Sequence, residues 1–224
     1  MSALTFTEEN YLKAIYNIQH NSAAGEVSVN EIAERMQTRP ATVTDMLRKL
    51  SEKALIHYEK YKKLHLSEQG TTRALQIIRK HRLWETFLHH KLNFSWDEVH
   101  EVAEQLEHIQ SQKLVERLDD YLGYPQFDPH GDPIPNSEGV LPVSSAQLLN
   151  ETEIDRACTI VAVKDTSSAF LRQLERLNLQ IGTRLNIQER MPFDNSILVE
   201  IDGKNAVMLS EKIALNIIVQ TTES

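Results

Sequence analysis

The stretch that decides the fold is residues 28–66, SVNEIAERMQTRPATVTDMLRKLSEKALIHYEKYKKLHL. It opens on a capping box, in which Ser28 and Glu31 are spaced to satisfy each other's backbone N–H groups at a helix start. Pro40 suits the first turn of a second helix, where its missing N–H costs nothing. Two short β-like runs then flank the basic turn at residues 60–63, which predicts a hairpin. Together these signals indicate a helix-turn-helix followed by a wing.

An amphipathic helix capped by Thr7 precedes this stretch, with apolar positions at Tyr11, Leu12, Ile15 and Ile18. Residues 35–63 hold eight basic side chains against three acidic ones, so they form a local patch that attracts phosphates. A solvated helix face and a protein-interaction module are the alternatives to DNA binding. The residues expected to face DNA are Arg39, Ala41, Thr42, Thr44, Asp45, Arg48 and Lys49 of the recognition helix, and Lys60, Lys62 and Lys63 of the wing.

The whole chain has 224 residues, with 24 Lys+Arg against 32 Asp+Glu and a formal net charge of -8. Hydrophobic residues make up 41% and charged residues 25%, which is ordinary for a globular protein and excludes a mainly disordered one. A single cysteine, Cys158, cannot form an internal disulfide. We find neither a secretory signal nor an apolar run long enough to span a membrane, and we expect a cytoplasmic protein.

The sequence predicts a mainly helical protein with a small β domain. Helices are expected over residues 68–92 and from a capping box at residues 95–98 to about Tyr121, either as a dimer interface or as a core pair within one subunit. Strands are expected at residues 157–163, 184–190, 196–201, 206–209 and 213–219, with a helix over 169–179, which suggests an SH3-like barrel. The predicted domains are residues 1–73 (winged helix), 74–124 (helical, dimerisation and metal binding), 125–150 (Pro/Gly-rich linker) and 151–224 (SH3-like).

Imidazoles and carboxylates share helix faces in the middle segment. His81 and Glu85 are four residues apart, and a second face carries His100, Glu104, Glu107 and His108. Oxygen and nitrogen donors of this kind suit Mn²⁺, Fe²⁺, Co²⁺ or Zn²⁺, and so many carboxylates repel one another without a cation. The alternatives are a polar, solvated face and a di-metal carboxylate oxidase, although the latter needs ligands from four helices rather than two.

Several motifs resemble the diphtheria-toxin-repressor/manganese-regulator family over essentially the whole chain. They are Glu9-Asn10-Tyr11-Leu12, Val43-Thr44, Tyr58-Glu59-Lys60-Tyr61, Lys80-His81-Arg82-Leu83, the run from Val99 to His108, and Asp128-Pro129-His130-Gly131-Asp132-Pro133-Ile134-Pro135. The C-terminal part is similar to the SH3-like (FeoA-type) domain of the longer members. The resemblance implies a homodimer that binds palindromic operator DNA when loaded with Mn²⁺ or Fe²⁺ and represses metal-uptake genes, with no membrane partner.

The resemblance also implies two metal sites. The primary site would use Asn10, Glu104, Glu107 and His108, and the ancillary site would use His81, Glu85 and His100. Asp128, His130 and Asp165 are further ancillary candidates, while Asp-Pro and His-Gly are also ordinary turn sequences.

Two positions bear on the choice of metal. Iron-sensing members often carry Cys where Glu104 stands, so Glu104 favours Mn²⁺, with Fe²⁺ as the alternative and Co²⁺ or Zn²⁺ as substitutes in vitro. Asn10 stands where the iron and manganese sensors have Met and Asp, so it would bind metal directly, bind through water, or make no contact. Besides the oxidase, a winged-helix repressor that senses a small organic ligand is the rival interpretation.

Overall fold

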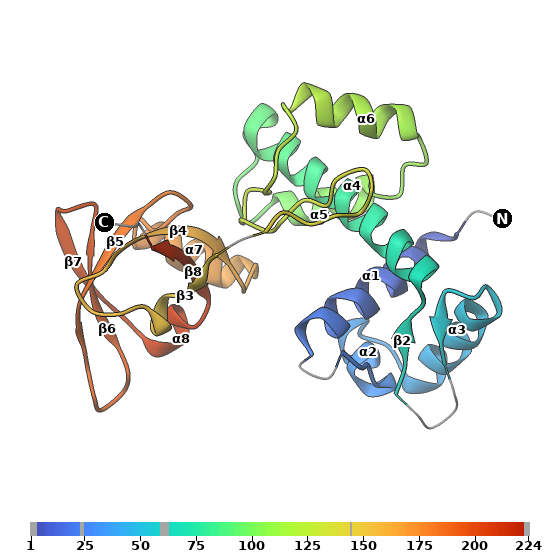
Figure 1. Cartoon of the computed structure of the whole chain (residues 1–224), viewed down its shortest axis with the longest axis horizontal. Helices are drawn as coiled ribbons and strands as arrows, with labels where there is room; N and C mark the ends of the chain where they lie inside the picture. Colours follow the sequence, from blue (N-terminus) through green and yellow to red (C-terminus); the bar gives the residue numbers. More distant parts are fainter. Residues whose placement is uncertain (1–3, 23–24, 59–62, 144, 222–224) are drawn as a thin grey trace. The chain divides into compact units, whose positions relative to one another are not determined.

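The computed structural model describes residues 4–22, 25–58, 63–143 and 145–221. Its elements, in order, are α1 (Phe6–Asn21), α2 (Val29–Arg35), α3 (Pro40–Glu52), β1 (Ile56–His57), β2 (His65–Leu66), α4 (Glu68–Leu92), α5 (Val99–Leu106), α6 (Gln112–Tyr121), β3 (Gln147–Leu148), a 3-10 turn (Leu149–Glu151), β4 (Ala157–Val163), α7 (Ser168–Arg176), β5 (Arg184–Arg190), β6 (Ile197–Ile201), β7 (Asn205–Leu209), α8 (Glu211–Ala214) and β8 (Ile217–Thr221) (Figure 1). None of the helices described is long and apolar enough to cross a membrane.

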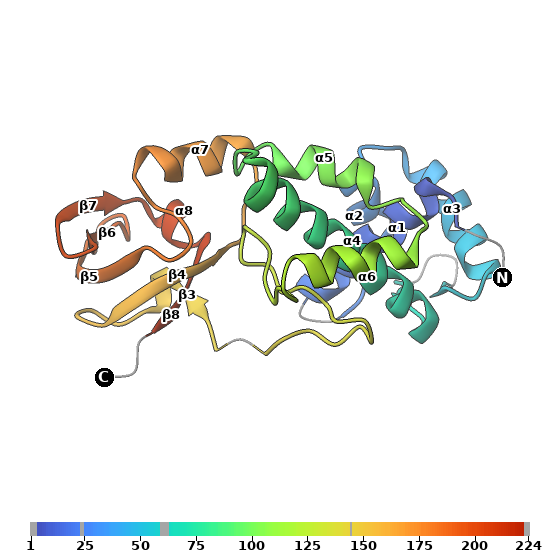
Figure 2. The same ribbon diagram turned by 90° about the horizontal axis from the view of Figure 1, so that it is seen from above.

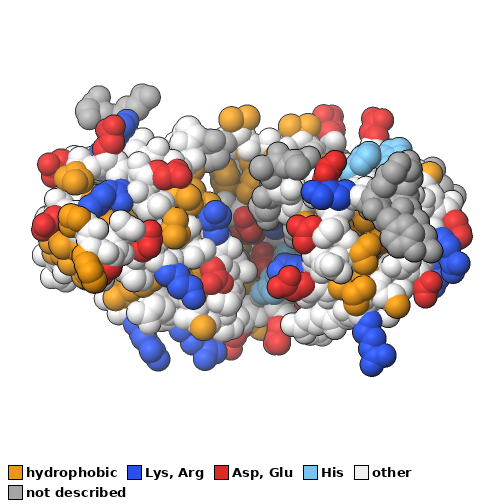
Figure 3. Space-filling view, turned by 90° about the horizontal axis from the view of Figure 1, so that it is seen from below, with side chains coloured by type: hydrophobic (Ala, Val, Ile, Leu, Met, Phe, Trp, Pro, Cys, Tyr) orange, Lys and Arg blue, Asp and Glu red, His pale blue; other side chains and the backbone are white. Residues whose placement is uncertain are grey.

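The chain divides into two compact units. The first comprises residues 1–81, 104–112 and 135–140, and the second comprises residues 82–103, 113–134 and 141–224. Acidic and basic side chains are interspersed over the face drawn in Figure 3, and its hydrophobic side chains stand in small groups. The surface drawn there therefore has the mixed character that the composition predicts.

Helices α1, α2 and α3 begin at residues that satisfy their exposed N–H groups. Ser28 and Glu31 form the predicted capping box of α2, and Pro40 is the first residue of α3. For α1 the predicted cap, Thr7, is wrong, because Thr5 accepts the backbone N–H of Glu8 and the Glu8 carboxylate accepts that of Thr5. The same reciprocal geometry thus starts α1 two residues earlier than expected.

The wing is a short antiparallel hairpin in which Ile56 pairs with Leu66 and His57 with His65. Lys60 and Lys62, predicted to lie at its tip, are outside the described residues. The first turn of α4 packs directly against the backbone before the hairpin, because a Cβ at Gly70 would lie only 1.9 Å from the Leu55 carbonyl oxygen. Apolar residues of α1, α2, α3, the hairpin and the start of α4 form one buried core, which includes Leu12, Ile32, Leu47, Leu50 and Leu64.

The predicted helix over residues 68–92 is confirmed as α4, but the single helix expected from residue 95 to about Tyr121 is wrong. The chain forms α5 and α6 instead, with residues 107–111 outside both helices. The break falls where Glu107 and His108 become buried among polar partners in the first unit. Those tertiary contacts replace the helical turn that periodicity alone would continue.

The second unit contains a six-stranded antiparallel sheet in the order β3-β8-β4-β5-β6-β7, with α7 beside it in Figure 2. The predicted strand over residues 213–219 is partly wrong: Ser210 caps the short helix α8, and the strand β8 begins only at Ile217. The core lies on alternating inward positions of the strands together with Leu171 and Leu174 of α7. Trp96, from the loop before α5, belongs to the same core.

The segment over residues 122–142 contains no helix or strand, as predicted, and all of it is described. Its part around His130 is held against the sheet, because the Val163 N–H donates to the His130 carbonyl oxygen over 2.9 Å. Gly131, at φ +85°, approaches β4 so closely that a Cβ would lie 1.9 Å from the Val161 carbonyl oxygen. This contact fixes the position of the two residues on either side of Pro129.

Candidate metal centres and nucleic-acid interface

The first polar cluster joins α1 to the segment that follows α5. The His108 Nδ1 atom lies 2.6 Å from Glu9 Oε2, and both side chains are buried. Because a carboxylate only accepts, this contact places a proton on His108 Nδ1, and in the neutral ring Nε2 keeps its lone pair for a cation. Gln110 Nε2 donates to the other Glu9 oxygen over 2.7 Å. Glu9 therefore orients His108 through a hydrogen bond.

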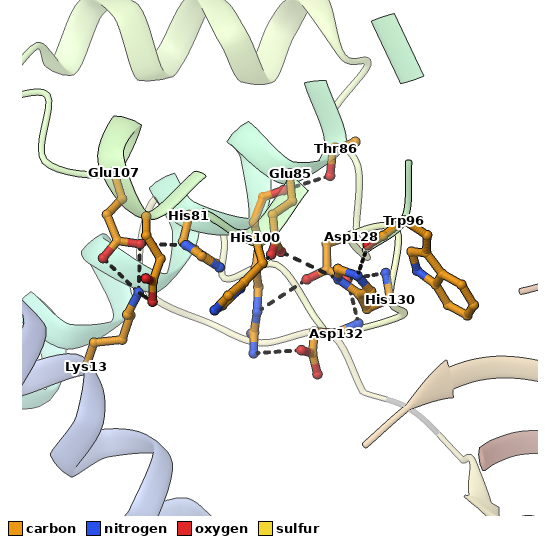
Figure 4. Close-up of polar contacts among 12 residues, drawn as sticks. Lys13, His81, Glu85, Thr86, Trp96, His100, Glu107, Asp128, His130 and Asp132 are labelled. Atoms are coloured by element: carbon orange, nitrogen blue, oxygen red, sulfur yellow. Dashed lines mark hydrogen bonds and ion pairs between the residues drawn. The ribbon is translucent and has the colours of Figure 1, made fainter. Parts of the chain in front are cut away.

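Glu107 lies at the centre of this cluster and is fully buried. Its Oε2 atom is 2.5 Å from His81 Nδ1, and the Lys13 ammonium lies 2.8 Å from both of its oxygens (Figure 4). Burial would raise the pKa of Glu107, but the His81 hydrogen bond and the Lys13 charge outweigh it and hold that pKa below its usual value. Apart from that ion pair with Lys13, Glu107 Oε1 makes no hydrogen bond, and it lies 3.9 Å from His108 Nε2.

The donor set at this point fits a divalent cation. Asn10 Oδ1 is buried without a hydrogen-bond partner, an arrangement that costs free energy unless something binds the oxygen. With Glu107 Oε1, which the Lys13 ammonium contacts, and His108 Nε2, the first unit offers a cation two hard oxygens and one imidazole nitrogen. Glu104 lies at the edge, about half exposed, with one oxygen 3.5 Å from Lys13 Nζ.

All four residues predicted for the primary site thus lie in the first unit. His81, predicted for the ancillary site, contacts Glu107 as well, and it also belongs to a group of possible metal ligands with Glu85 and His100. Sequence reasoning missed Glu9 and Lys13 as members of this cluster. The signal was available, because residues 9 and 13 are one helical turn apart and flank residue 10 on the same helix.

The second cluster lies entirely in the second unit, around the buried Glu85 of α4. His100 Nδ1 lies 3.1 Å from Glu85 Oε1, and His130 Nδ1 lies 3.8 Å from Glu85 Oε2 (Figure 4). Ligand atoms of Glu85, Asp128 and His130 all lie within 4.8 Å of one another, and the three side chains are buried. This grouping brings the linker residues Asp128 and His130 to α4, as the sequence suggested.

Hydrogen bonds around this cluster leave suitable donor atoms. His130 Nε2 donates to the Trp96 carbonyl oxygen over 3.0 Å, which leaves Nδ1 unprotonated toward Glu85 when the ring is neutral. Asp128 Oδ1 accepts the backbone N–H groups of His130 and Asp132, whereas Asp128 Oδ2 is buried without a hydrogen bond.

The charges of the cluster shift two pKa values. Burial, together with Glu85 and Asp132, raises the pKa of Asp128 well above its ordinary value. Burial alone would lower the pKa of His130, but the hydrogen bond and charge of Glu85 outweigh it and raise that pKa. The Asp128 shift comes first from burial and then from repulsion by Glu85 and Asp132, which Arg82, 3.7 Å from Asp128 Oδ2, only partly offsets. A bound cation would relieve that repulsion.

Asp165, the remaining ancillary candidate, has another role in the structure. Its Oδ1 atom accepts the backbone N–H of Ser167 over 2.9 Å, just before α7. Among the described residues, it is not in the group whose ligand atoms converge on Glu85.

The candidate nucleic-acid interface is the exposed face of α3. Val43, Leu47 and Leu50 are buried, which turns the opposite positions to solvent. The exposed members of the predicted set are Arg39, Ala41, Thr42, Asp45, Arg48, Lys49 and Lys63. Thr44 differs, since it is half-buried and its hydroxyl donates to the Pro40 carbonyl oxygen over 3.0 Å. The face thus carries mixed charge, including the 3.9 Å pair of Arg48 with Asp45.

Three family models match the chain. Residues 3–64 match the iron dependent repressor N-terminal DNA binding domain, residues 67–136 match the iron dependent repressor metal binding and dimerisation domain, and residues 147–221 match the FeoA domain.

Individual relatives are similar over most of the chain. It is 31% identical over 168 residues to the iron-dependent repressor IdeR of Mycobacterium tuberculosis, covering 73% of this chain and 72% of that protein. A solved manganese-dependent transcriptional repressor in complex with manganese is 35% identical, with a TM-score of 0.86 over 96% of this chain and 100% of the other. ScaR with bound Cd²⁺ is 34% identical, with a TM-score of 0.78 over 96% of this chain and 99% of that one.

Proposed function

Because the chain belongs to the iron-dependent repressor family and is therefore a metal-dependent transcriptional repressor, we propose that Mn²⁺ is the ion that activates it. The donor atoms support this choice, since the available groups in both clusters are carboxylate or amide oxygens and imidazole nitrogens. Such hard donors suit Mn²⁺, whereas thiolates select softer ions. The one cysteine, Cys158, is buried in β4, where burial raises its pKa to about 11.

We place the activating ion among Asn10, Glu107 and His108, with Glu104 as the fourth protein ligand. Asn10 comes from the DNA-binding region, and the other three come from the end of α5 and the turn after it. When bound, the ion supplies a link between these two regions. The chain's own residues prepare that link, because Glu9 orients His108 and His81 holds one Glu107 oxygen.

We assign the ancillary site to Glu85, Asp128 and His130, with His100 beside Glu85. The carboxylates of Glu85 and Asp128 raise each other's affinity for a cation, and His130 contributes Nδ1. His81 groups with Glu85 and His100 but also holds a Glu107 oxygen, and we propose that it supports the primary site.

The proposed partner is palindromic double-stranded operator DNA, bound by a homodimer. Two α3 helices related by the dimer axis would enter successive major grooves about 34–36 Å apart. The second unit exposes Leu92, Leu114 and Tyr121 on α4 and α6, and such apolar side chains are suited to an interface between copies.

One observation carries the proposal: the buried 2.6 Å contact between Glu9 of α1 and His108. It joins the DNA-binding region directly to the metal-binding segment, so an ion held at His108 acts on both.

The test is a titration of operator binding with each metal in turn, run anaerobically for Fe²⁺. We expect Mn²⁺ to produce tight binding at lower free-ion concentration than Fe²⁺, Co²⁺ or Zn²⁺. Activation by Fe²⁺ at lower free concentration than Mn²⁺ would overturn the choice of metal. Operator affinity that does not change on adding a chelator would overturn the proposed switch itself.

A further inference from the structure

The side chain of Lys13 already forms ion pairs with the carboxylates of the first cluster. The Lys13 ammonium is 2.8 Å from Glu107 Oε1 and Oε2 and 3.5 Å from Glu104 Oε1. Glu107 is fully buried, and the Lys13 side chain is only 13% exposed. The pair is therefore far from the exposed ion pairs that contribute little and exchange freely with water.

Helix α1 carries both the Lys13 ammonium and the unpartnered Asn10 oxygen, which is a candidate metal ligand. Lys13 is three residues after Asn10 and four after Glu9, so the three residues lie on neighbouring turns of one helix face. Lys13 thus approaches Glu107 from the same element as the unpartnered Asn10 oxygen.

Glu107 Oε1 is the carboxylate oxygen that an incoming ion would use. His81 holds Oε2, whereas Oε1 contacts only the Lys13 charge and faces His108 Nε2 at 3.9 Å. An ion that used Oε1 would stand beside the ammonium, and two cations so close repel each other strongly.

We propose that Lys13 is a tethered cation that neutralises Glu107 in the metal-free protein and must yield that oxygen to the incoming ion. This inference rests on the proposed primary site. Lys13 then has two effects. It stabilises the buried, charged Glu107 carboxylate in the metal-free protein, and it raises the free metal concentration at which the site fills. It sets the threshold of the sensor without being a ligand.

The test measures Mn²⁺ binding directly by isothermal titration calorimetry, with no DNA present. Lys13→Met keeps the length and the apolar stem but removes the charge. We expect it to bind Mn²⁺ about tenfold or more tightly, because even at the dielectric constant of water a unit charge beside a divalent ion interacts by more than the thermal energy. Lys13→Arg keeps the charge and should bind with wild-type affinity.

Lys53→Met is the matched control. Lys53, at the end of α3, pairs over 2.6 Å with Glu8 of α1, so its removal also deletes a Lys–Glu pair but touches neither Glu104 nor Glu107. Its Mn²⁺ affinity should equal that of the wild type. Equal or weaker Mn²⁺ binding by Lys13→Met, with Lys53→Met unchanged, would overturn the inference.

Thermal unfolding gives a second readout. Without metal, Lys13→Met should melt below the wild type because Glu107 loses a counter-charge, and saturating Mn²⁺ should raise its melting temperature by more than it raises that of the wild type. Lys13→Gln serves the same test if the Met variant does not fold. If His108→Ala keeps wild-type Mn²⁺ affinity, the primary site is misplaced; if His108→Ala loses binding while Lys13→Met is unchanged, only the role of Lys13 is wrong.

Discussion

At the scale of single residues, the first cluster is defined by atoms whose hydrogen-bonding capacity is incomplete. Asn10 Oδ1 is buried without a hydrogen-bond partner, and Glu107 Oε1 makes no hydrogen bond beyond its 2.8 Å ion pair with Lys13, whereas Glu9 and His108 are hydrogen-bonded. Buried polar groups are rarely left so, because each costs roughly 1–3 kcal/mol. These two oxygens therefore mark the place where an ion would contribute most.

Asn10→Asp tests that reasoning. The substitution adds a negative oxygen at the position of the unpartnered amide oxygen, so Mn²⁺ affinity should rise, whereas Asn10→Ala should lower it. In the absence of metal Asn10→Asp should be less stable than the wild type, since it buries a charge. Calorimetric titration and melting curves with and without Mn²⁺ check both effects; an Asp variant with unchanged affinity would mean that residue 10 does not contact the ion.

Substitutions in the first cluster should impair activation by Mn²⁺ more than substitutions in the second cluster. Glu107→Ala or His108→Ala removes one of about four ligands and should abolish Mn²⁺-activated operator binding while leaving a folded protein. His100→Ala and His130→Ala should weaken activation less, because they belong to the second cluster. The check is operator titration with circular dichroism to confirm folding. Wild-type activation in His108→Ala, with loss in His130→Ala, would reverse the two sites.

At the scale of elements, α3 and the wing should contribute differently to DNA binding. Lys63 is exposed, and we propose that it meets DNA phosphates, so Lys63→Ala should weaken binding to all sequences and reduce the salt slope by about 1. Thr42 is exposed on α3, so Thr42→Ala should change which sequences are preferred. The Thr44 hydroxyl donates to the Pro40 carbonyl oxygen, so Thr44 is less suited than Thr42 to contact DNA bases. Equal effects of Lys63→Ala and Thr42→Ala on sequence preference would contradict the assignment.

The linker should be sensitive at one glycine. Gly131→Ala would drive a Cβ into the backbone of β4, displacing the segment that carries Asp128 and His130. We expect a loss of at least about 2 kcal/mol in the free energy of unfolding. Gly123→Ala is the control, since Gly123 also has positive φ, at +76°, but nothing within 4 Å of an added Cβ. Equal losses in the two variants would show that backbone strain, not the contact with β4, decides the effect.

Elements that carry their own local signal could be predicted from the sequence. Three local signals were sufficient to predict their helices: the Ser28 capping box for α2, Pro40 for the start of α3, and the long apolar periodicity for α4. The division between α5 and α6 was not predictable in this way, because it depends on Glu107 finding partners from α1 and α4 that are distant in sequence. For the same reason periodicity could not identify Lys13, whose role depends on a carboxylate 94 residues away.

At the scale of the whole molecule, the chain combines a DNA-binding region, a metal-binding region and a FeoA domain. The motifs at residues 80–83, 99–108 and 128–135 were specific enough to predict this organisation and the metal-dependent repressor function. The structure adds which atoms meet. It places Glu9 on His108, and it brings linker residues to Glu85 of α4.

The central claim is that one ion couples the DNA-binding region to the metal-binding segment, and coupling is reciprocal. The direct measurement is the Mn²⁺ affinity of the wild type with and without saturating operator DNA, compared with the operator affinity with and without saturating Mn²⁺. We predict that operator DNA tightens Mn²⁺ binding by the same factor as Mn²⁺ tightens operator binding, and that His108→Ala reduces this factor toward one. A Mn²⁺ affinity that is identical with and without operator would contradict it.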